Sequence, residues 1–354
     1  MFWMTETRFV LPQTLVGGGG AHSYSPEAGF ELSVVESGGQ PFSELILSWN
    51  ADTPPGTSIY PEARLRYTEA DAPPEASAWS AWASLGRWGS GSHGEQRLPH
   101  SHGGEAGAPV RLEVDTLRLD TGLVADAFQV RLTLSGWSDT PVVRRLTAST
   151  RLVGASPPDA LADQPLGRAV RLAVPDRSQR AECHEIAGEI CSPASIGMVL
   201  DYYGIARTTA EIAEAVFDHG AQIYGNWPFN VAYAGSLGLR GVVRHIGSMA
   251  EIERELGAGH PPILSIAFGP GELPEAPIPS TDGHLIVVTG VTQSGDFLVN
   301  DPAADTRRGE AIERVYSRDH LRAAFLGHGG VAYIIEKEPD ASAAPLPADA
   351  PSTK

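Results

Sequence analysis

The stretch Cys191-Ser-Pro-Ala-Ser-Ile-Gly-Met-Val-Leu-Asp-Tyr-Tyr-Gly204 decides the fold of the second half of this chain. Its apolar side chains recur with the i, i+3, i+4, i+7 spacing of an amphipathic helix. Pro193 favours a helix start and Gly204 a helix stop, so the sequence predicts a helix over 192–203. Four residues form the apolar stripe: Ile196, Val199, Leu200 and Tyr203.

Cys191 stands directly before this helix. A thiol at a helix N-terminus faces unpaired backbone N–H groups and the positive end of the helix dipole, and both favour the thiolate that a nucleophile needs. The alternative is a small buried apolar residue, which is what most lone cysteines are. Cys183, eight residues earlier, is either a free thiol or the partner of Cys191 in a disulfide that would mask the nucleophile.

His284 opens the apolar run 284–291, and Asp301 follows the next apolar run at Leu298-Val-Asn300. Gly295-Asp296 between the runs predicts a turn, so we expect two antiparallel strands that bring His284 and Asp301 together. The acid would then fix the imidazole tautomer while the other ring nitrogen faces the thiol. The alternatives are an edge-strand histidine and an Asx-type turn before Pro302.

Further signals in the second half predict a mixed fold. Thr208-x-x-Glu211 and Ser248-x-x-Glu251 have the pattern of capping boxes, each opening a helix. Strands are predicted at 262–268, 284–291, 297–300 and 331–335. Helices followed by a sheet indicate an α+β domain over 169–338.

The first half differs in pattern. Short runs with period-2 alternation, bounded by Gly, Pro, Asp and Ser, predict an antiparallel β-sandwich or jelly-roll domain over 1–153. The aperiodic segment 154–168 is interpreted as a linker, and the Pro/Ala-rich segment 339–354 as a disordered tail.

Composition excludes several classes of function. The 354 residues are 42% hydrophobic and 19% charged, which is ordinary for a globular protein of about two domains. The formal net charge of −17 repels phosphate backbones and anionic lipid, so we expect no nucleic-acid partner. No stretch is apolar enough for a membrane span, and no ligand spacing supports a metal. No cofactor is expected.

Four motifs in order resemble the peptidase C39-like family, papain-fold cysteine peptidase domains related to bacteriocin-processing peptidases. They are Gln179 with the stretch 191–204, Gly225-Asn-Trp-Pro-Phe-Asn230, Gly283-His-Leu-Ile-Val-Val-Thr-Gly290 and Val299-Asn-Asp-Pro-Ala303. The resemblance covers about residues 169–337. The first half is similar to a β-rich segment that precedes this domain in some secreted bacterial members.

The resemblance implies a triad of Cys191, His284 and Asp301, with Gln179 donating to the oxyanion. In the relatives this glutamine lies six residues before the cysteine, where this chain has Glu185, whose carboxylate would repel an oxyanion. A longer loop that brings Gln179 to the same place is therefore expected, with the backbone N–H of Cys191 as second donor.

The segment 225–230 has two readings. Asn226, Trp227 and Asn230 would form one wall of the substrate cleft, with the tryptophan supplying apolar area and the amides holding a peptide backbone. A packed loop that anchors a helix is the alternative.

Peptide-bond hydrolysis is the expected reaction, on a peptide or protein substrate. The alternatives are an amidase or transamidase acting on cell-wall or other peptide with the same triad, and a catalytically silent binding protein whose β domain holds a sugar or a protein. The N-terminus shows no signal-peptide pattern, which favours the cytoplasm by default, whereas the resemblance implies a secreted or cell-surface protein.

Overall fold

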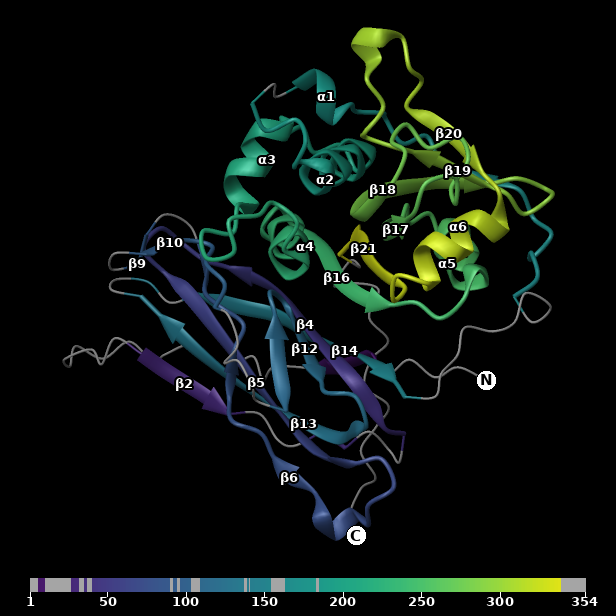
Figure 1. The fold of residues 1–354 in the computed structure, drawn as a ribbon. Helices are drawn as coiled ribbons and strands as arrows, with labels where there is room; N and C mark the ends of the chain where they lie inside the picture. Colours follow the sequence, from purple (N-terminus) through teal and green to yellow (C-terminus); the bar gives the residue numbers. More distant parts are fainter. Residues whose placement is uncertain are drawn as a thin grey trace, which may run out of the picture.

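A computed structural model shows two domains, one above the other in Figure 1. It describes residues 6–9, 27–31, 35–36, 40–89, 92–93, 96–102, 109–136, 139, 141–153, 163–182 and 185–338. Cys183, most of the expected linker and the expected tail therefore lie outside the described residues.

The first domain is built from antiparallel strands. They are β1 (Glu6–Phe9), β2 (Glu27–Glu31), β3 (Val35–Glu36), β4 (Phe42–Asp52), β5 (Ser58–Glu69), β6 (Ala78–Trp79), β7 (Ala83–Ser84), β8 (Trp88–Gly89), β9 (Ser92–His93), β10 (Gln96–Arg97), β11 (Val110–Glu113), β12 (Thr116–Leu119), β13 (Leu123–Ser135) and β14 (Val142–Leu152). All but β9 and β10 join one sheet with the main order β1-β14-β4-β13-β5-β6. The antiparallel β domain is confirmed, but the jelly-roll arrangement stays a prediction.

The core of this domain follows from the alternation seen in the sequence. In β4 the side chains of Leu45, Leu47 and Trp49 belong to the buried apolar cluster of the domain. Burying such side chains contributes roughly 1.5–3 kcal/mol each. The alternation therefore places apolar side chains on the buried face of the sheet, and their burial stabilises the domain.

The second domain combines six helices with an antiparallel sheet. The helices are α1 (Gln179–Glu182), α2 (Cys191–Tyr202), α3 (Thr209–Val216), α4 (Trp227–Ser236), α5 (Met249–Gly257) and α6 (Arg318–Leu326). The strands are β15 (Val170–Arg171), β16 (Leu239–His245), β17 (Ile263–Phe268), β18 (Thr281–Val291), β19 (Phe297–Asn300), β20 (Glu313–Tyr316) and β21 (Val331–Lys337). The sheet order is β16-β21-β17-β18-β19-β20, with β15 paired to β18. The predicted α+β class is confirmed.

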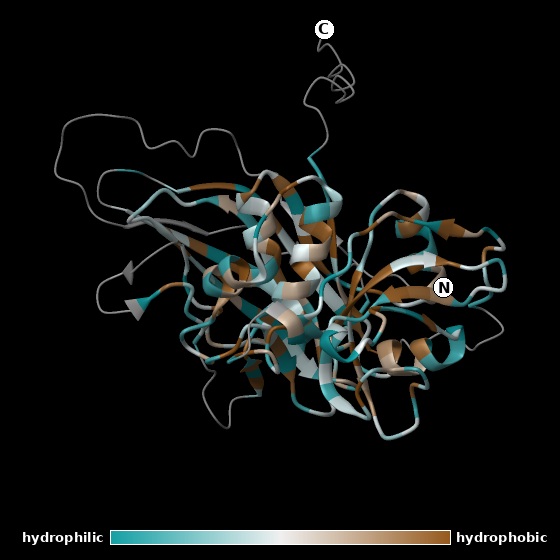
Figure 2. Ribbon diagram, turned by 90° about the horizontal axis from the view of Figure 1, so that it is seen from above, coloured by the Kyte–Doolittle hydropathy of each residue, from teal (hydrophilic) through white to brown (hydrophobic). Residues whose placement is uncertain are grey.

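Helices cover both faces of this sheet. One apolar cluster joins α2, α3 and α4 to the sheet, and another joins α5 and α6 to it. Successive residues of β18 belong to opposite clusters, Leu285 and Val287 to the first and Ile286 and Val288 to the second. Figure 2 shows the corresponding hydrophobic colouring along the central strands. This two-sided burial explains the uninterrupted apolar run in the sequence.

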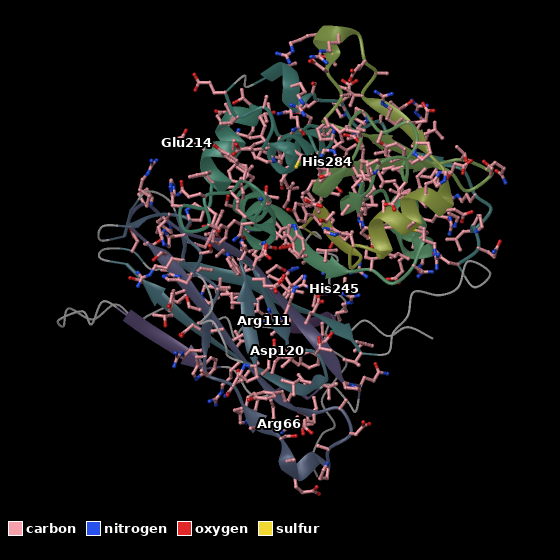
Figure 3. All side chains as sticks on the ribbon, viewed as in Figure 1. Arg66, Arg111, Asp120, Glu214, His245 and His284 are labelled. Atoms are coloured by element: carbon pink, nitrogen blue, oxygen red, sulfur yellow. The ribbon has the colours of Figure 1, made fainter. Side chains whose placement is uncertain are left out.

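The edge strand β16 is covered by the first domain. Its outward N–H groups donate to side chains of β4 and β14: Gly241 to Asn50 (3.3 Å), Val243 to Ser48 (3.2 Å) and His245 to Ser149 (2.9 Å). Figure 3 labels His245 where the two domains meet. An exposed strand edge is a template for unwanted pairing, so these polar side chains satisfy and hide it.

Helix α4 strengthens the same boundary. Phe229 of α4 packs with its ring centroid 6.1 Å from Trp49 and 5.7 Å from Trp88 of the first domain. A Cβ atom at Gly235 would lie 2.6 Å from the amide nitrogen of Asn50, so only glycine lets α4 approach β4 this closely. The two domains thus share apolar core as well as hydrogen bonds.

The end of the expected linker packs onto the second domain. Asp163 is buried, and its carboxylate accepts hydrogen bonds from the backbone N–H groups of Met249 and Ala250 at the start of α5. The carboxylate therefore caps this helix and complements its dipole. Asp163 thus attaches the end of the expected linker to the second domain.

Candidate active site

Cys191 is the first residue of α2, and Ile190 before it provides no side-chain cap. No side chain of the N-cap residue therefore competes for the N–H groups of Cys191 and Ser192 at the start of this turn. Burial raises the pKa of the Cys191 thiol, but a hydrogen bond to His284, the charge of His284 and hydrogen bonds from the N–H groups of Leu285 and Ser192 outweigh it. The net effect lowers the pKa of the thiol, which is the direction expected for a nucleophile.

His284 lies in β18 and is almost fully buried. Its Nε2 is 2.7 Å from Oδ1 of Asp301, which leaves Nδ1 for the hydrogen bond to Cys191. Burial lowers the pKa of His284, but the charge and hydrogen bond of Asp301, followed by those of Cys191, raise it to about 10. The cationic form of the imidazole is therefore favoured beside the Asp301 carboxylate.

Asp301 follows β19 and has no exposed surface. Oδ1 accepts from His284 and from the backbone N–H of Ala303 (3.0 Å), while Oδ2 accepts from the Tyr316 hydroxyl (2.8 Å). Burial raises the pKa of the carboxyl, and the charge of His284 together with these donors lowers it below its usual value. Asp301 is thus kept ionised inside the protein.

The β18–β19 hairpin brings the histidine and the acid together. Val287 pairs with Asn300 in the antiparallel register, so His284 and Asp301 both lie near the open end of the hairpin. Gly295 closes the other end with a φ of 93°, a conformation that glycine adopts without steric cost. The predicted juxtaposition of the two side chains is present in the structure.

Gln179 begins α1 and is nearly fully buried. Its backbone N–H donates to the carbonyl of Pro302 (2.9 Å), next to Asp301, and its Nε2 donates to the carbonyl of Ala187 (2.8 Å). A side-chain amide has two N–H donors, so one remains for another acceptor. Glu185, at the position that the relatives use, is exposed.

The structure gives the two amides of segment 225–230 internal partners. Asn226 is the N-cap of α4, accepting from the N–H of Phe229 (3.2 Å) and donating to Asp218 (2.9 Å). Asn230 donates to the carbonyls of Tyr224 and Asn226. Both side chains are buried, so the geometry fits the alternative of a packed loop that anchors a helix. Trp227 is partly exposed.

Two residues at or near the site were not found from the sequence. Tyr316 ends β20 and binds Asp301, but its segment resembles any strand with a core aromatic residue. Asp115 lies between β11 and β12 of the first domain and accepts from the backbone N–H of Trp227 (2.7 Å). No local sequence signal connects residues 112 positions apart.

Other kinds of site are not found in the part of the chain that the structure describes. There, no group of three or more His, Cys, Asp or Glu side chains is arranged to hold a metal ion. No helix among the same residues has the length and hydropathy needed to cross a membrane.

Two family models match separate parts of the chain. Residues 171–332 match the family model described as Peptidase_C39 like, and residues 19–151 match the model of the Peptidase C39 N-terminal domain. Among solved structures, a protein described as a C39-like peptidase from Bacillus anthracis is 18% identical, with a TM-score of 0.38, over 48% of this chain and 98% of its own.

A second solved structure is the peptidase domain of Streptococcus ComA, a bifunctional ABC transporter involved in quorum sensing. It is 18% identical, with a TM-score of 0.32, over 42% of this chain and 93% of its own. No curated protein matches the chain.

Proposed function

Because residues 171–332 match the Peptidase_C39 like family, we propose that this protein is a cysteine peptidase that hydrolyses peptide bonds with Cys191 as nucleophile. The observation that carries the proposal is the position of His284. Its Nε2 lies 2.7 Å from Asp301, and the same imidazole lowers the pKa of Cys191. This is the arrangement of nucleophile, base and orienting acid that acyl transfer requires.

The chemistry follows from these contacts. The Cys191 thiolate attacks the carbonyl carbon, and protonated His284 gives its proton to the departing amine. Water then attacks the thioester carbon while deprotonated His284 takes its proton. The carbon–sulfur bond breaks, the carboxylic acid product is released, and the Cys191 thiolate and protonated His284 are restored. Asp301 holds the imidazole in orientation and stabilises its cationic form.

The oxyanion has two candidate donors. One is the backbone N–H of Cys191 in the uncapped first turn of α2, and the other is the second N–H of the Gln179 amide. Removing one such donor typically costs about 100- to 1000-fold in rate. For substrate binding, Trp227 is the residue of segment 225–230 that we retain, because Asn226 and Asn230 are buried and their Nδ2 groups donate to internal acceptors.

The test combines alkylation with peptide cleavage. Iodoacetamide labelling of Cys191 is followed by mass spectrometry from pH 4 to 9 in the wild type, in His284→Ala and in the exposed-histidine control His320→Ala. We expect wild type and control to label well below the ordinary thiol pKa of about 8.5, and His284→Ala to lose this reactivity. A mixed peptide library should be cut by the wild type and left intact by Cys191→Ala.

Two results would contradict the proposal. Labelling of Cys191 that follows an ordinary thiol, with no peptide cut, would point to a silent site and turn attention to the first domain. Peptide products capped by an added amine, rather than ending in a free carboxylate, would make the protein a transamidase.

A further inference from the structure

Asp115 is a buried carboxylate that the proposed mechanism does not use. It lies at the turn between β11 and β12, and its partners are the N–H of Trp227 at 2.7 Å and the hydroxyl of Thr116 at 3.1 Å. Burial raises its pKa to about 7, and the nearby charge of Asp218 adds to the rise. A buried carboxylate is costly unless it is paired, yet neither of these partners is a cation. Its placement therefore calls for an explanation.

The hydrogen bond from Trp227 crosses the domain boundary. Trp227 is the first residue of α4, so the carboxylate of the first domain lies at the positive end of this helix. The Asn226 side chain caps only the N–H of Phe229, and Asp115 satisfies another N–H of the same turn. The first domain thus helps to fix where α4 begins.

This contact and the nucleophile adjoin the same apolar cluster, because Trp227 and Cys191 both pack against it. The Tyr333 hydroxyl is 3.1 Å from the hydroxyl of Ser192, the residue after Cys191. Burial raises the pKa of Tyr333, and the charges of both Asp115 and Cys191 contribute to the rise. Tyr333 belongs to the apolar cluster against which both Cys191 and Trp227 pack, so the starts of α2 and α4 lie on the same side of the sheet.

Apolar surface accompanies the contact. Val114, beside Asp115, is 36% exposed and has a φ of 58°, the left-handed region that a β-branched residue rarely adopts. Trp227, bonded to Asp115, is also partly exposed. Strained residues that persist in a structure often lie at functional sites.

We infer that the first domain forms part of the peptide-binding cleft: Asp115 positions Trp227, and Trp227 with Val114 receives a bulky apolar side chain of the substrate. The inference rests on the proposed peptidase function. It makes Asp115 a positioning residue and the β11–β12 turn a determinant of specificity. The preferred substrates are peptides with a large apolar residue near the scissile bond.

The test compares Asp115→Ala, Asp115→Asn and the control Asp120→Ala in the full chain. Asp120 follows the same pair of strands but forms an exposed ion pair with Arg111. Each variant is assayed with the best apolar peptide from the library and with the same peptide carrying glycine at the apolar position. Hydrogen exchange of residues 227–230 is measured in parallel by mass spectrometry.

We expect Asp115→Ala to raise KM for the apolar peptide about 5- to 10-fold, the loss of one hydrogen bond, with kcat changed less than about 2-fold. The glycine peptide should be unaffected, and exchange at 227–230 should become faster. Asp115→Asn keeps an oxygen acceptor for Trp227 and should restore KM. Asp120→Ala should match the wild type.

The inference is overturned if Asp115→Ala leaves KM and the hydrogen exchange of residues 227–230 unchanged. It is also overturned if KM rises equally for both peptides, or if Asp115→Asn does not restore KM. If the wild type cuts no peptide at all, the peptidase proposal itself has failed. Hydrogen exchange then decides alone: unchanged exchange in Asp115→Ala refutes the positioning role, and faster exchange at 227–230 supports it.

Discussion

Replacing Tyr316 by phenylalanine tests the electrostatics of the proposed triad without touching any of its three members. The Tyr316 hydroxyl donates to Oδ2 of Asp301 at 2.8 Å, and both residues are buried. Burial and the charge of Asp301 raise the pKa of Tyr316, so the phenol stays a neutral donor throughout the working pH range. The variant removes one donor and keeps the aromatic ring.

The size of the effect follows from the kind of bond. A hydrogen bond to a charged group contributes about 1.5–3 kcal/mol, and one pKa unit corresponds to about 1.4 kcal/mol. The pKa of Asp301 should therefore rise by about 1–2 units. Since the pKa of Asp301 starts below its usual value, Asp301 stays ionised at pH 7 and becomes protonated at a higher pH than in the wild type, at the acid end of the profile. In that range the protonated Asp301 no longer supplies a negative charge beside His284, and the ion pair of His284 with Cys191 is lost.

The assay is the pH dependence of Cys191 alkylation, compared with NMR titration of the His284 imidazole. Tyr316→Phe should move the acid limb of alkylation upward by about one unit and lower the pKa of His284, with little change near pH 7. Tyr203→Phe, whose hydroxyl binds the carbonyl of Ile335 at 2.8 Å, is the matched control. Profiles of Tyr316→Phe and wild type that superimpose, in a folded variant, would refute this account of how Asp301 is held.

Two further predictions concern the domain boundary. Asn50→Ala should lower the free energy of unfolding by about 2–4 kcal/mol in urea titrations, because both the N–H and the carbonyl of Gly241 lose a buried partner. A loss under about 0.5 kcal/mol would contradict the conclusion that Asn50 covers the edge of β16. Asp115 binds its proton more tightly in the folded than in the unfolded chain. Protonated Asp115 therefore stabilises the folded protein at low pH, and this stabilisation is lost as the pH rises from about 4 to about 7. The pKa of Asp115 is shifted by about three units, so the free energy of unfolding of Asp115→Asn, relative to that of the wild type, should rise by up to about 4 kcal/mol from pH 4 to pH 8. A difference between the two proteins that is equal at both pH values would exclude this titration of Asp115.

Local signals were sufficient for much of the second domain. The helix after Cys191 and the hairpin of His284 and Asp301 were predictable because apolar spacing and turn residues act within about twenty positions. The helix α4 was missed as a continuous element, although Asn226 as N-cap and Pro228 in the first turn are start signals that the sequence carries. The turn-rich composition of 225–230 concealed them.

The sequence by itself determined the α+β class of the second half, the helix after Cys191, the hairpin of His284 and Asp301, and the identity of the candidate nucleophile, base and acid. Only the tertiary structure decided that Tyr316 holds Asp301, that Asp115 reaches Trp227 across the domain boundary and that Asn50 covers β16. The reason is physical. Periodicity and capping express interactions between near neighbours in the chain, whereas a buried polar group takes whichever partner the packed fold brings within about 3 Å.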